Sequence, residues 1–119
     1  MTKVLLVDDD LSFRRSLMIQ LEMEGFQVTE AESGKDALSK LNLSKGSCDF
    51  PDVVVTDMRM PEMEGPALIR RIQMDYPVVP IIVMSAFEPP EDIDERYFLH
   101  KPFKIFEIMD TMAHVIKEH

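Results

Sequence analysis

Short apolar runs alternate along this chain with segments of helical periodicity, and this alternation restricts the fold more than any other feature. Continuous, β-branched runs stand at 4–7, 53–56 and 81–84. Such runs are typical of strands buried on both faces of a parallel sheet. Residues 26–29 alternate apolar and polar side chains, which favours a strand nearer the sheet edge, and 96–99 is a fifth, short candidate.

Helical segments separate and follow these runs. Their apolar positions are Phe13, Leu17 and Leu21; Ala37, Leu38 and Leu41; Leu68, Ile69 and Ile72; and Ile105, Ile108, Met109, Met112 and Ile116. Gly25 is well placed to end the first helix, Ser33 to cap the second, and Pro66 to lie in the first turn of the third. Strands that alternate with helices predict βαβ units with right-handed crossovers. We therefore expect an α/β fold, a doubly wound five-stranded parallel sheet with the flavodoxin-like strand order 2-1-3-4-5.

The interval between Ser85 and Lys101 is unusually short for this pattern. It holds 15 residues, with a Pro-Pro pair at 89–90 and five acidic residues. A strand and two loops must fit there as well, which leaves room for about two helical turns. The fourth helix is therefore expected to be short, distorted or absent.

Length and charge narrow the class of protein. The 119 residues fit a single domain, 1–119, and 13 Lys and Arg against 22 Asp and Glu give a net charge of −9. This balance argues against direct binding of nucleic acid or an anionic membrane by the chain alone. A single cysteine, Cys48, fits a reducing compartment, and neither a membrane span nor a signal peptide is apparent. We expect a cytoplasmic protein.

The carboxyl ends of the predicted strands carry polar side chains of a particular kind. Asp8, Asp9 and Asp10 follow the first strand, Asp57 the third, Ser85 the fourth, and Lys101 the fifth. In doubly wound sheets these ends share one crevice, where ligands bind. Clustered carboxylates repel one another, and a bound Mg²⁺ offsets this repulsion. Mg²⁺ takes oxygen ligands, among them carboxylates and phosphoryl oxygens. An Asp there can act as a nucleophile, and a lysine and a hydroxyl can hold phosphoryl oxygens.

In order along the chain, these residues resemble the receiver domains of two-component response regulators. The likeness rests on the segments 4–10 (VLLVDDD), 53–65 (VVVTDMRMPEMEG), 80–86 (PIIVMSA) and 101–103 (KPF). Each motif alone is weak, but the four in register are specific and span nearly the whole chain.

The resemblance implies a role for each matching residue. Asp57 would accept a phosphoryl group from a histidine kinase or phosphotransfer protein, with Ser85 and Lys101 contacting that group. Asp8, Asp9, Asp57 and the backbone carbonyl of Arg59 would hold Mg²⁺, with Asp9 the more direct ligand of the first two. The resemblance also implies a cis peptide bond at Pro102.

Some positions depart from the family pattern. Asp10 lengthens the acidic run and is interpreted as a helix cap, and Ser85 stands where Thr is commoner. Phe98 falls at the position of the family's switch aromatic and lacks the phenolic hydroxyl that many members carry, so it would act through packing. The short 86–100 interval affects the surface that family members use for partners or for dimers.

Other functions remain as alternatives. A phosphate-independent interaction module of the same fold would leave partner binding unchanged by Asp57→Asn. An aspartate phosphatase would need a second Asp at the position of Arg59, and flavin or dinucleotide carriers would need a Ser/Thr/Gly-rich or Gly-rich turn after the first strand. We therefore expect no enzyme activity beyond autocatalytic phosphoryl acceptance and loss. The output partner, a phosphorylation-dependent homodimer, and a stand-alone or fragment origin stay open.

Overall fold

The computed structural model describes residues 1–60, 65–89 and 91–119. Helices and strands alternate along it in the following order: β1 (Lys3–Val7), α1 (Leu11–Met23), β2 (Gln27–Ala31), α2 (Gly34–Ser44), β3 (Val53–Asp57), α3 (Gly65–Asp75), β4 (Ile81–Ser85), the 3-10 helix η1 (Glu95–Tyr97), β5 (Phe98–His100) and α4 (Ile105–Glu118).

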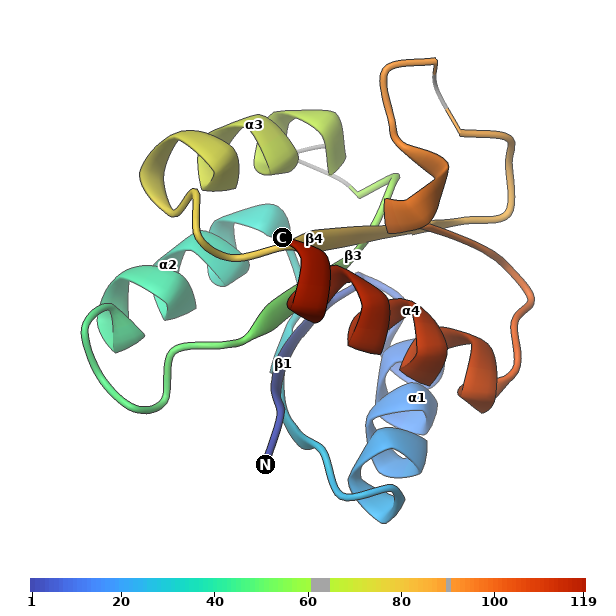
Figure 1. Cartoon of the computed structure of the whole chain (residues 1–119), viewed down its shortest axis with the longest axis horizontal. Coiled ribbons are helices and arrows are strands. Elements are labelled where there is room, and N and C mark those ends of the chain that lie inside the picture. The colour runs from blue at the N-terminus through green and yellow to red at the C-terminus, as the bar shows by residue number, and fades with distance from the viewer. Residues whose placement is uncertain (61–64, 90) are drawn as a thin grey trace.

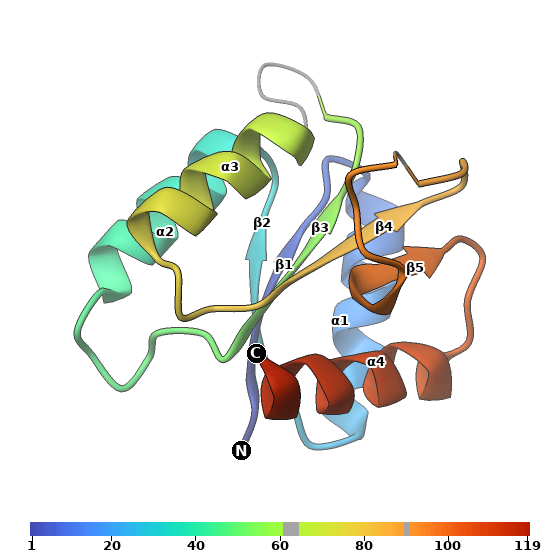
Figure 2. The same cartoon turned by 45° about the horizontal axis from the view of Figure 1, so that its top comes forward.

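The strands form one parallel five-stranded sheet. Its order is β2-β1-β3-β4-β5, and every neighbouring pair is parallel. Figure 2 shows the sheet between two helical layers, with α2 and α3 on one side and α1 and α4 on the other. The predicted doubly wound architecture and strand order are confirmed. The strand expected at 26–29 covers Gln27–Ala31 and lies at the edge of the sheet, as its alternating pattern predicted.

Each face of the sheet has its own core, because successive side chains of a strand point to opposite faces. Leu6, Val55 and Ile82 pack with α1 and α4, whereas Leu5 and Val54 pack with α2 and α3. All are at most 2% exposed. Burial of three consecutive strands on both faces explains why their sequences are continuous apolar runs rather than alternating ones.

The helix ends follow the predicted signals. The Asp10 side chain caps α1 by accepting from Phe13 N at 3.1 Å, and Ser33 Oγ caps α2 by accepting from Asp36 N at 3.0 Å. Gly25 has a positive φ of 94° just after α1, a conformation that favours glycine at a helix C-terminus. These caps fix where each helix begins, and so fix the loops that carry the acidic residues.

The bounds of the fifth strand and the buried face of the last helix also differ from the prediction. The fifth strand was expected at 96–99 but covers Phe98–His100, because Arg96 and Tyr97 belong to η1. On α4, Ile116 is 37% exposed, whereas Val115 is buried beside Ile108 and Met112. The apolar face of the last turn is therefore rotated by one residue from the predicted stripe.

The interval after β4 contains no α-helix in its described part, 86–89 and 91–97. A three-residue 3-10 helix, η1, capped by Asp94, precedes β5 directly. The expectation of a short or distorted fourth helix is confirmed. Figure 1 shows the consequence: this segment forms an extended loop beside β4 rather than a second full helix next to α3.

Candidate functional site

Three carboxylates meet where β1 and β3 end. Asp8 and Asp9 directly follow β1, Asp57 is the last residue of β3, and the two strands are paired in parallel register. One carboxylate oxygen from each lies within 4.8 Å of the others. Asp8 is buried, Asp57 is half-buried and Asp9 is exposed, so the cluster opens to solvent on one side.

Lys101 reaches the same cluster from the end of β5. Its Nζ donates to Asp57 Oδ1 at 2.9 Å and to Asp8 Oδ2 at 3.2 Å. Its backbone N–H donates to Ser85 O at 2.8 Å, which ties the end of β5 to the end of β4. The ammonium also lies 4.1 Å from the centroid of the Phe13 ring, a cation–π contact supplied by α1. Several elements thus hold one charged group in place.

The acidic cluster and the lysine shift each other's protonation. Burial raises the pKa of Asp8 above its ordinary value, more than the Asp10 backbone N–H and the Lys101 charge lower it. For Lys101, burial acts to lower the pKa, but the hydrogen bond to Asp57 and the negative charge of Asp8 outweigh it, so the pKa is raised. The lysine therefore stays a cation, and the Asp8 carboxylate is held at a cost in folding free energy.

The loops after β3 and β4 surround Asp57. The Arg59 backbone N–H donates to Asp57 Oδ2 at 3.2 Å, and the Arg59 guanidinium carbon lies 4.3 Å from the centroid of the Phe87 ring. Ser85 is buried, and its Oγ accepts from Phe87 N at 3.0 Å. The Arg59–Phe87 contact joins the two loops across the entrance to the carboxylates.

Gly65 sets the path of the chain beyond Asp57. Its N–H donates to Met58 O at 2.9 Å, and a Cβ at this position would lie 2.7 Å from that oxygen and 2.9 Å from Met58 Cα. Real Cβ atoms do not approach backbone so closely, so glycine is required here for close approach of the two segments. Residues 61–64, which belong to the 53–65 segment that resembles the family, lie outside the described residues.

The sequence reasoning missed Arg14. This buried side chain donates through Nη1 to the Asp8 carbonyl at 2.6 Å and through Nε to Glu30 Oε1 at 2.9 Å. It thereby holds the β1–α1 turn against the end of β2. The signal was present: Arg14, Leu17 and Leu21 stand at i, i+3 and i+7, so an arginine occupies the apolar face of α1.

The remaining predicted residues take defined places. The Lys101–Pro102 peptide bond is cis. Phe98 is half-buried in β5, with its Cα opposite that of Val83 on β4. Asp10 serves as the α1 cap and does not belong to the three-carboxylate cluster. The structure thus brings Asp8, Asp9, Asp57, Ser85 and Lys101 to one edge of the sheet.

Comparison with known proteins decides the family. The sequence profile of the response regulator receiver domain matches residues 4–113. This chain belongs to the receiver domain family. The profile covers every strand end that contributes to the site, from Asp8 to Lys101.

Individual receiver-containing proteins show the same likeness. The DNA-binding transcriptional regulator NtrC of Klebsiella pneumoniae is 33% identical over 120 residues, which are 96% of this chain and 24% of NtrC. The transcriptional regulatory protein PhoP of Escherichia coli is 32% identical over 98% of this chain and 53% of PhoP. This receiver domain therefore spans about a quarter to about half of the length of these relatives.

Solved structures share the fold over nearly the whole chain. The chemotaxis protein CheY4 of Vibrio cholerae has a TM-score of 0.83 and 30% identity, covering 97% of this chain and 98% of CheY4. The receiver domain of the Francisella response regulator 1452 has a TM-score of 0.83 and 29% identity, covering 99% and 98%. Although the described part of the segment after β4 contains no α-helix, the sheet keeps the order β2-β1-β3-β4-β5.

The donor set of the site fits a magnesium ion. Three carboxylates with oxygens within 4.8 Å supply the hard ligands that Mg²⁺ prefers, and Asp9 is exposed to solvent, which suits an ion that keeps several waters. The chemistry available at this edge is thus that of carboxylates, one ammonium and one hydroxyl, at a place that fits a divalent cation.

Among the helices of residues 1–60, 65–89 and 91–119, none combines the length and the apolar composition of a membrane span.

Proposed function

We propose that this receiver domain is a signalling switch that is turned by phosphorylation of Asp57 from a histidine kinase or phosphotransfer protein. The observation that carries the proposal is the position of Asp57, half-buried between the Lys101 ammonium at 2.9 Å and the Arg59 backbone N–H at 3.2 Å. Both donors bind carboxylate oxygens and suit phosphoryl oxygens equally well.

The reaction is a transfer of one phosphoryl group. A carboxylate oxygen of Asp57 attacks the phosphorus of a phosphohistidine, a P–O bond forms, and the P–N bond breaks with its electron pair returning to the imidazole. Since little covalent chemistry is needed, catalysis consists of placing the carboxylate and neutralising charge on the phosphoryl oxygens. Lys101 supplies one positive charge, from a side chain that three contacts already hold in place.

Asp8, Asp9, Asp57 and the Arg59 carbonyl are the groups proposed to hold Mg²⁺. When bound, the ion supplies positive charge against the phosphoryl oxygens and offsets the repulsion among the carboxylates. Arg14 holds the Asp8 backbone in place by donating a hydrogen bond to the Asp8 carbonyl.

The response to phosphorylation would start at Ser85. Its oxygen accepts from Phe87 N in this structure, and the same hydroxyl can donate its O–H to a phosphoryl group on Asp57, which would pull on the loop after β4. Phe98, half-buried in β5 beside Val83, would change its packing as that loop moves. The proposed output is therefore a change of the β4–β5 surface that a partner protein or a linked output domain recognises.

The test is phosphorylation of the purified chain by a small phosphoryl donor, acetyl phosphate, with and without Mg²⁺. Intact mass spectrometry should detect one added phosphoryl group, labile to hydroxylamine, only with Mg²⁺. Asp57→Asn should not be modified, whereas Asp49→Asn, an exposed aspartate outside the site, should behave as wild type. Equal modification of the wild-type and Asp57→Asn proteins would reject the proposal.

The alternative is an interaction module that no longer depends on phosphate, and the three-residue η1 in place of a helix favours it. The intact acid, hydroxyl and lysine set argues for the switch. Partner binding distinguishes the switch from the phosphate-independent module. Asp57→Asn should leave partner binding unchanged for the module and alter it for the switch. As a switch, the chain would act in the cytoplasm and would turn over no external substrate. Size-exclusion chromatography with and without beryllofluoride would show whether the phosphorylated form dimerises.

A further inference from the structure

A groove of about 490 Å³ lies on the α2–α3 side of the sheet, next to α3, and Asp57 is not among the residues that line it. Its floor is made by β4, where Ile81 and Val83 point to this face, and by Val79 just before the strand. The short segment after β4 creates the groove, because η1 covers this part of the sheet with one 3-10 turn where α2 and α3 cover the rest with 11-residue helices.

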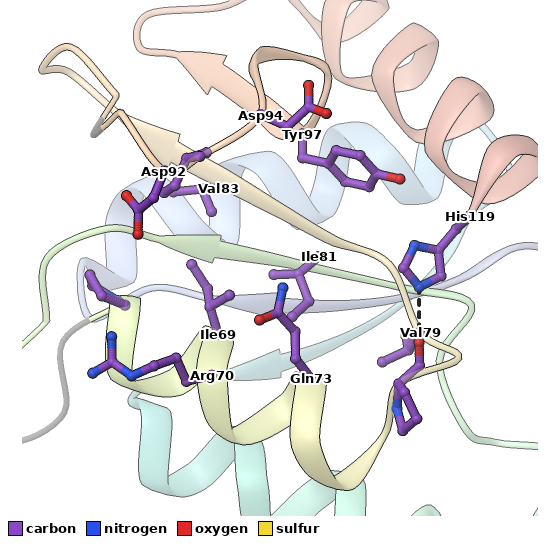
Figure 3. A pocket seen from close by; sticks show the side chains of 13 residues that line it. Ile69, Arg70, Gln73, Val79, Ile81, Val83, Asp92, Asp94, Tyr97 and His119 are labelled. Carbon is purple, nitrogen blue, oxygen red and sulfur yellow. Dashed lines mark hydrogen bonds between the residues drawn. The ribbon is translucent and has the colours of Figure 1, made fainter.

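The two walls of the groove come from different elements, one from α3 and the other from the segment that ends in η1. Figure 3 shows Ile69, Arg70 and Gln73 projecting from α3 on one side and Asp92 and Tyr97 on the other. Ile93 adds a half-buried apolar side chain to the second wall.

One end of the groove is closed by contacts between distant parts of the chain. There the His119 ring bonds through Nε2 to Pro77 O at 3.0 Å, and the Tyr97 ring meets the His119 ring edge to face at 6.2 Å. The groove is thus open along its length, apolar at its floor and polar at its rim.

The segment that supplies the second wall is acidic, and it contributes Asp92 and Asp94 to the lining of the groove. The segment 86–97 carries five exposed acidic residues and one arginine. Arg96 pairs with Asp94 at 2.8 Å and with Glu118 at 3.6 Å, whereas within the described residues Glu88, Glu91, Asp92 and Glu95 have no ion-pair partner. On the α3 wall, Arg70 lines the groove, whereas Arg71 does not line it and pairs with Asp75 at 3.0 Å.

These features specify the chemistry of an occupant. A helix is the element that covers a sheet face beside another helix, and the groove runs alongside α3 in the layer that α2 and α3 form. An apolar face would contact the half-buried apolar side chains of the two walls, Ile69, Ile93 and Tyr97. Lysine or arginine on its flank would meet Asp92. One acidic residue on the opposite flank would meet Arg70.

We propose that this groove is a docking site for a basic amphipathic helix of a partner protein. The occupant would lie over Val83, a floor residue that is 2% exposed and stands two residues before Ser85 on the same strand and opposite Phe98. The site needs no phosphoryl group on Asp57 to form, so it stands independently of the proposed phosphorylation.

The probe is a synthetic fluorescent helix with leucine at every third or fourth position, lysine elsewhere and one glutamate on a flank. Binding to the unphosphorylated full chain is measured by anisotropy, and its location by amide chemical-shift changes. Two control peptides keep the design but replace every lysine by glutamate, or every leucine by serine. We expect saturable binding of the first peptide only, with shifts confined to residues 69–73, 79–83 and 92–97.

Matched charge reversals place the site. Asp92→Lys should weaken binding of the lysine peptide about tenfold and strengthen that of the glutamate peptide. Glu22→Lys, which changes the net charge equally on the exposed face of α1, should leave both affinities unchanged. Ile69→Ser tests the apolar wall and should also weaken binding, with a thermal melt showing that the variant is folded.

Three results would overturn the proposal. Equal losses in Asp92→Lys and Glu22→Lys would mean that only net charge attracts the peptide. Retained binding of the serine control peptide would remove the role of the apolar floor. Concentration-dependent dimerisation of the chain alone, with shifts at the same amides, would assign the groove to a second copy instead of a partner helix.

Discussion

Lys101 Nζ lies 2.9 Å from Asp57 Oδ1, nearer than to Asp8 Oδ2 at 3.2 Å. The ammonium therefore already neutralises the proposed phosphoacceptor before any phosphoryl group arrives. It contacts Asp8 and Asp57, which are two of the three carboxylates proposed to bind Mg²⁺. The lysine and the metal thus draw on a shared set of oxygens, and each should weaken the hold of the other on them.

The first prediction follows from this competition. Lys101→Met removes the ammonium and should strengthen Mg²⁺ binding several-fold while abolishing the conformational response to beryllofluoride. Calorimetric titration of Mg²⁺ and amide chemical shifts with beryllofluoride measure the two effects. Lys117→Met, an equal charge change on an exposed turn of α4, should alter neither. Weaker Mg²⁺ binding in Lys101→Met would contradict the competition.

The second prediction concerns Asp8. Burial raises its pKa above the ordinary value of 3.8, so its contribution to stability is fully present below that pH and is lost as pH rises through the folded pKa. Above that pH the carboxyl group of Asp8 therefore opposes folding. Asp8→Asn should raise the midpoint of thermal unfolding at neutral pH in EDTA, and the gain should vanish in acid.

The same variant should lose function while gaining stability. Mg²⁺ should stabilise the wild-type protein against heat but have little effect on Asp8→Asn, since one of three carboxylates is gone. Asp49→Asn provides the control for removing a charge elsewhere. A lower unfolding midpoint of Asp8→Asn in EDTA would show that its bonds to Lys101 outweigh the cost of burial.

The third prediction compares two arginines that bind one glutamate. Arg14 and Arg15 both pair with Glu30, at 2.9 and 3.1 Å, but the Arg14 side chain is 8% exposed and that of Arg15 is 52% exposed. Only Arg14 also bonds to the Asp8 carbonyl. Arg14→Met should lower the free energy of unfolding by about 2 kcal/mol, because buried partners are left unsatisfied, whereas Arg15→Met should cost at most about 1 kcal/mol.

The pH dependence separates these variants further. Burial acts to raise the pKa of Glu30, but hydrogen bonds from Arg14 and Arg15 outweigh it and lower the pKa below 4.5. Its stabilising contribution is therefore present above pH 4.5 and is lost as pH falls through the lowered value. Chemical denaturation across this range should show a smaller loss in Arg14→Met than in the wild type. Equal slopes would mean that Arg15 alone sets the Glu30 titration.

The sequence predicts the sheet and the site well because both depend on local patterns. Continuous apolar runs mark central strands, and each run ends in the residue that the site uses, such as Asp57 after Val53–Thr56. Parallel order then brings these ends together without further information. The caps Asp10 and Ser33 were predictable for the same reason, since each acts on the helix that follows it.

Features that depend on contacts between distant segments were not predictable in this way. The Arg14–Glu30 pair joins α1 to the end of β2, and the cation–π contact of Lys101 with Phe13 joins β5 to α1. The short 86–100 interval predicted a missing helix but not the groove, whose walls come from α3 and from the segment before η1. No single stretch of sequence contains such a surface.

The last prediction concerns the turn that leads away from Asp57. A Cβ on Gly65 would stand 2.7 Å from Met58 O and 3.0 Å from Asp57 O, and these are backbone atoms that cannot rotate away. Gly65→Ala should therefore lower the free energy of unfolding by about 1 to 3 kcal/mol. It should also slow phosphorylation by acetyl phosphate, since relief of the clash displaces the backbone that carries Asp57. Thermal melts and initial phosphorylation rates measure the two effects separately.

Ala67→Gly, two residues into the same helix, lowers helix propensity without a clash and should reduce stability by about 1 kcal/mol with an unchanged phosphorylation rate. If both variants slow phosphorylation equally, the effect comes from loss of α3 stability and not from the contact of Gly65 with the backbone of Met58.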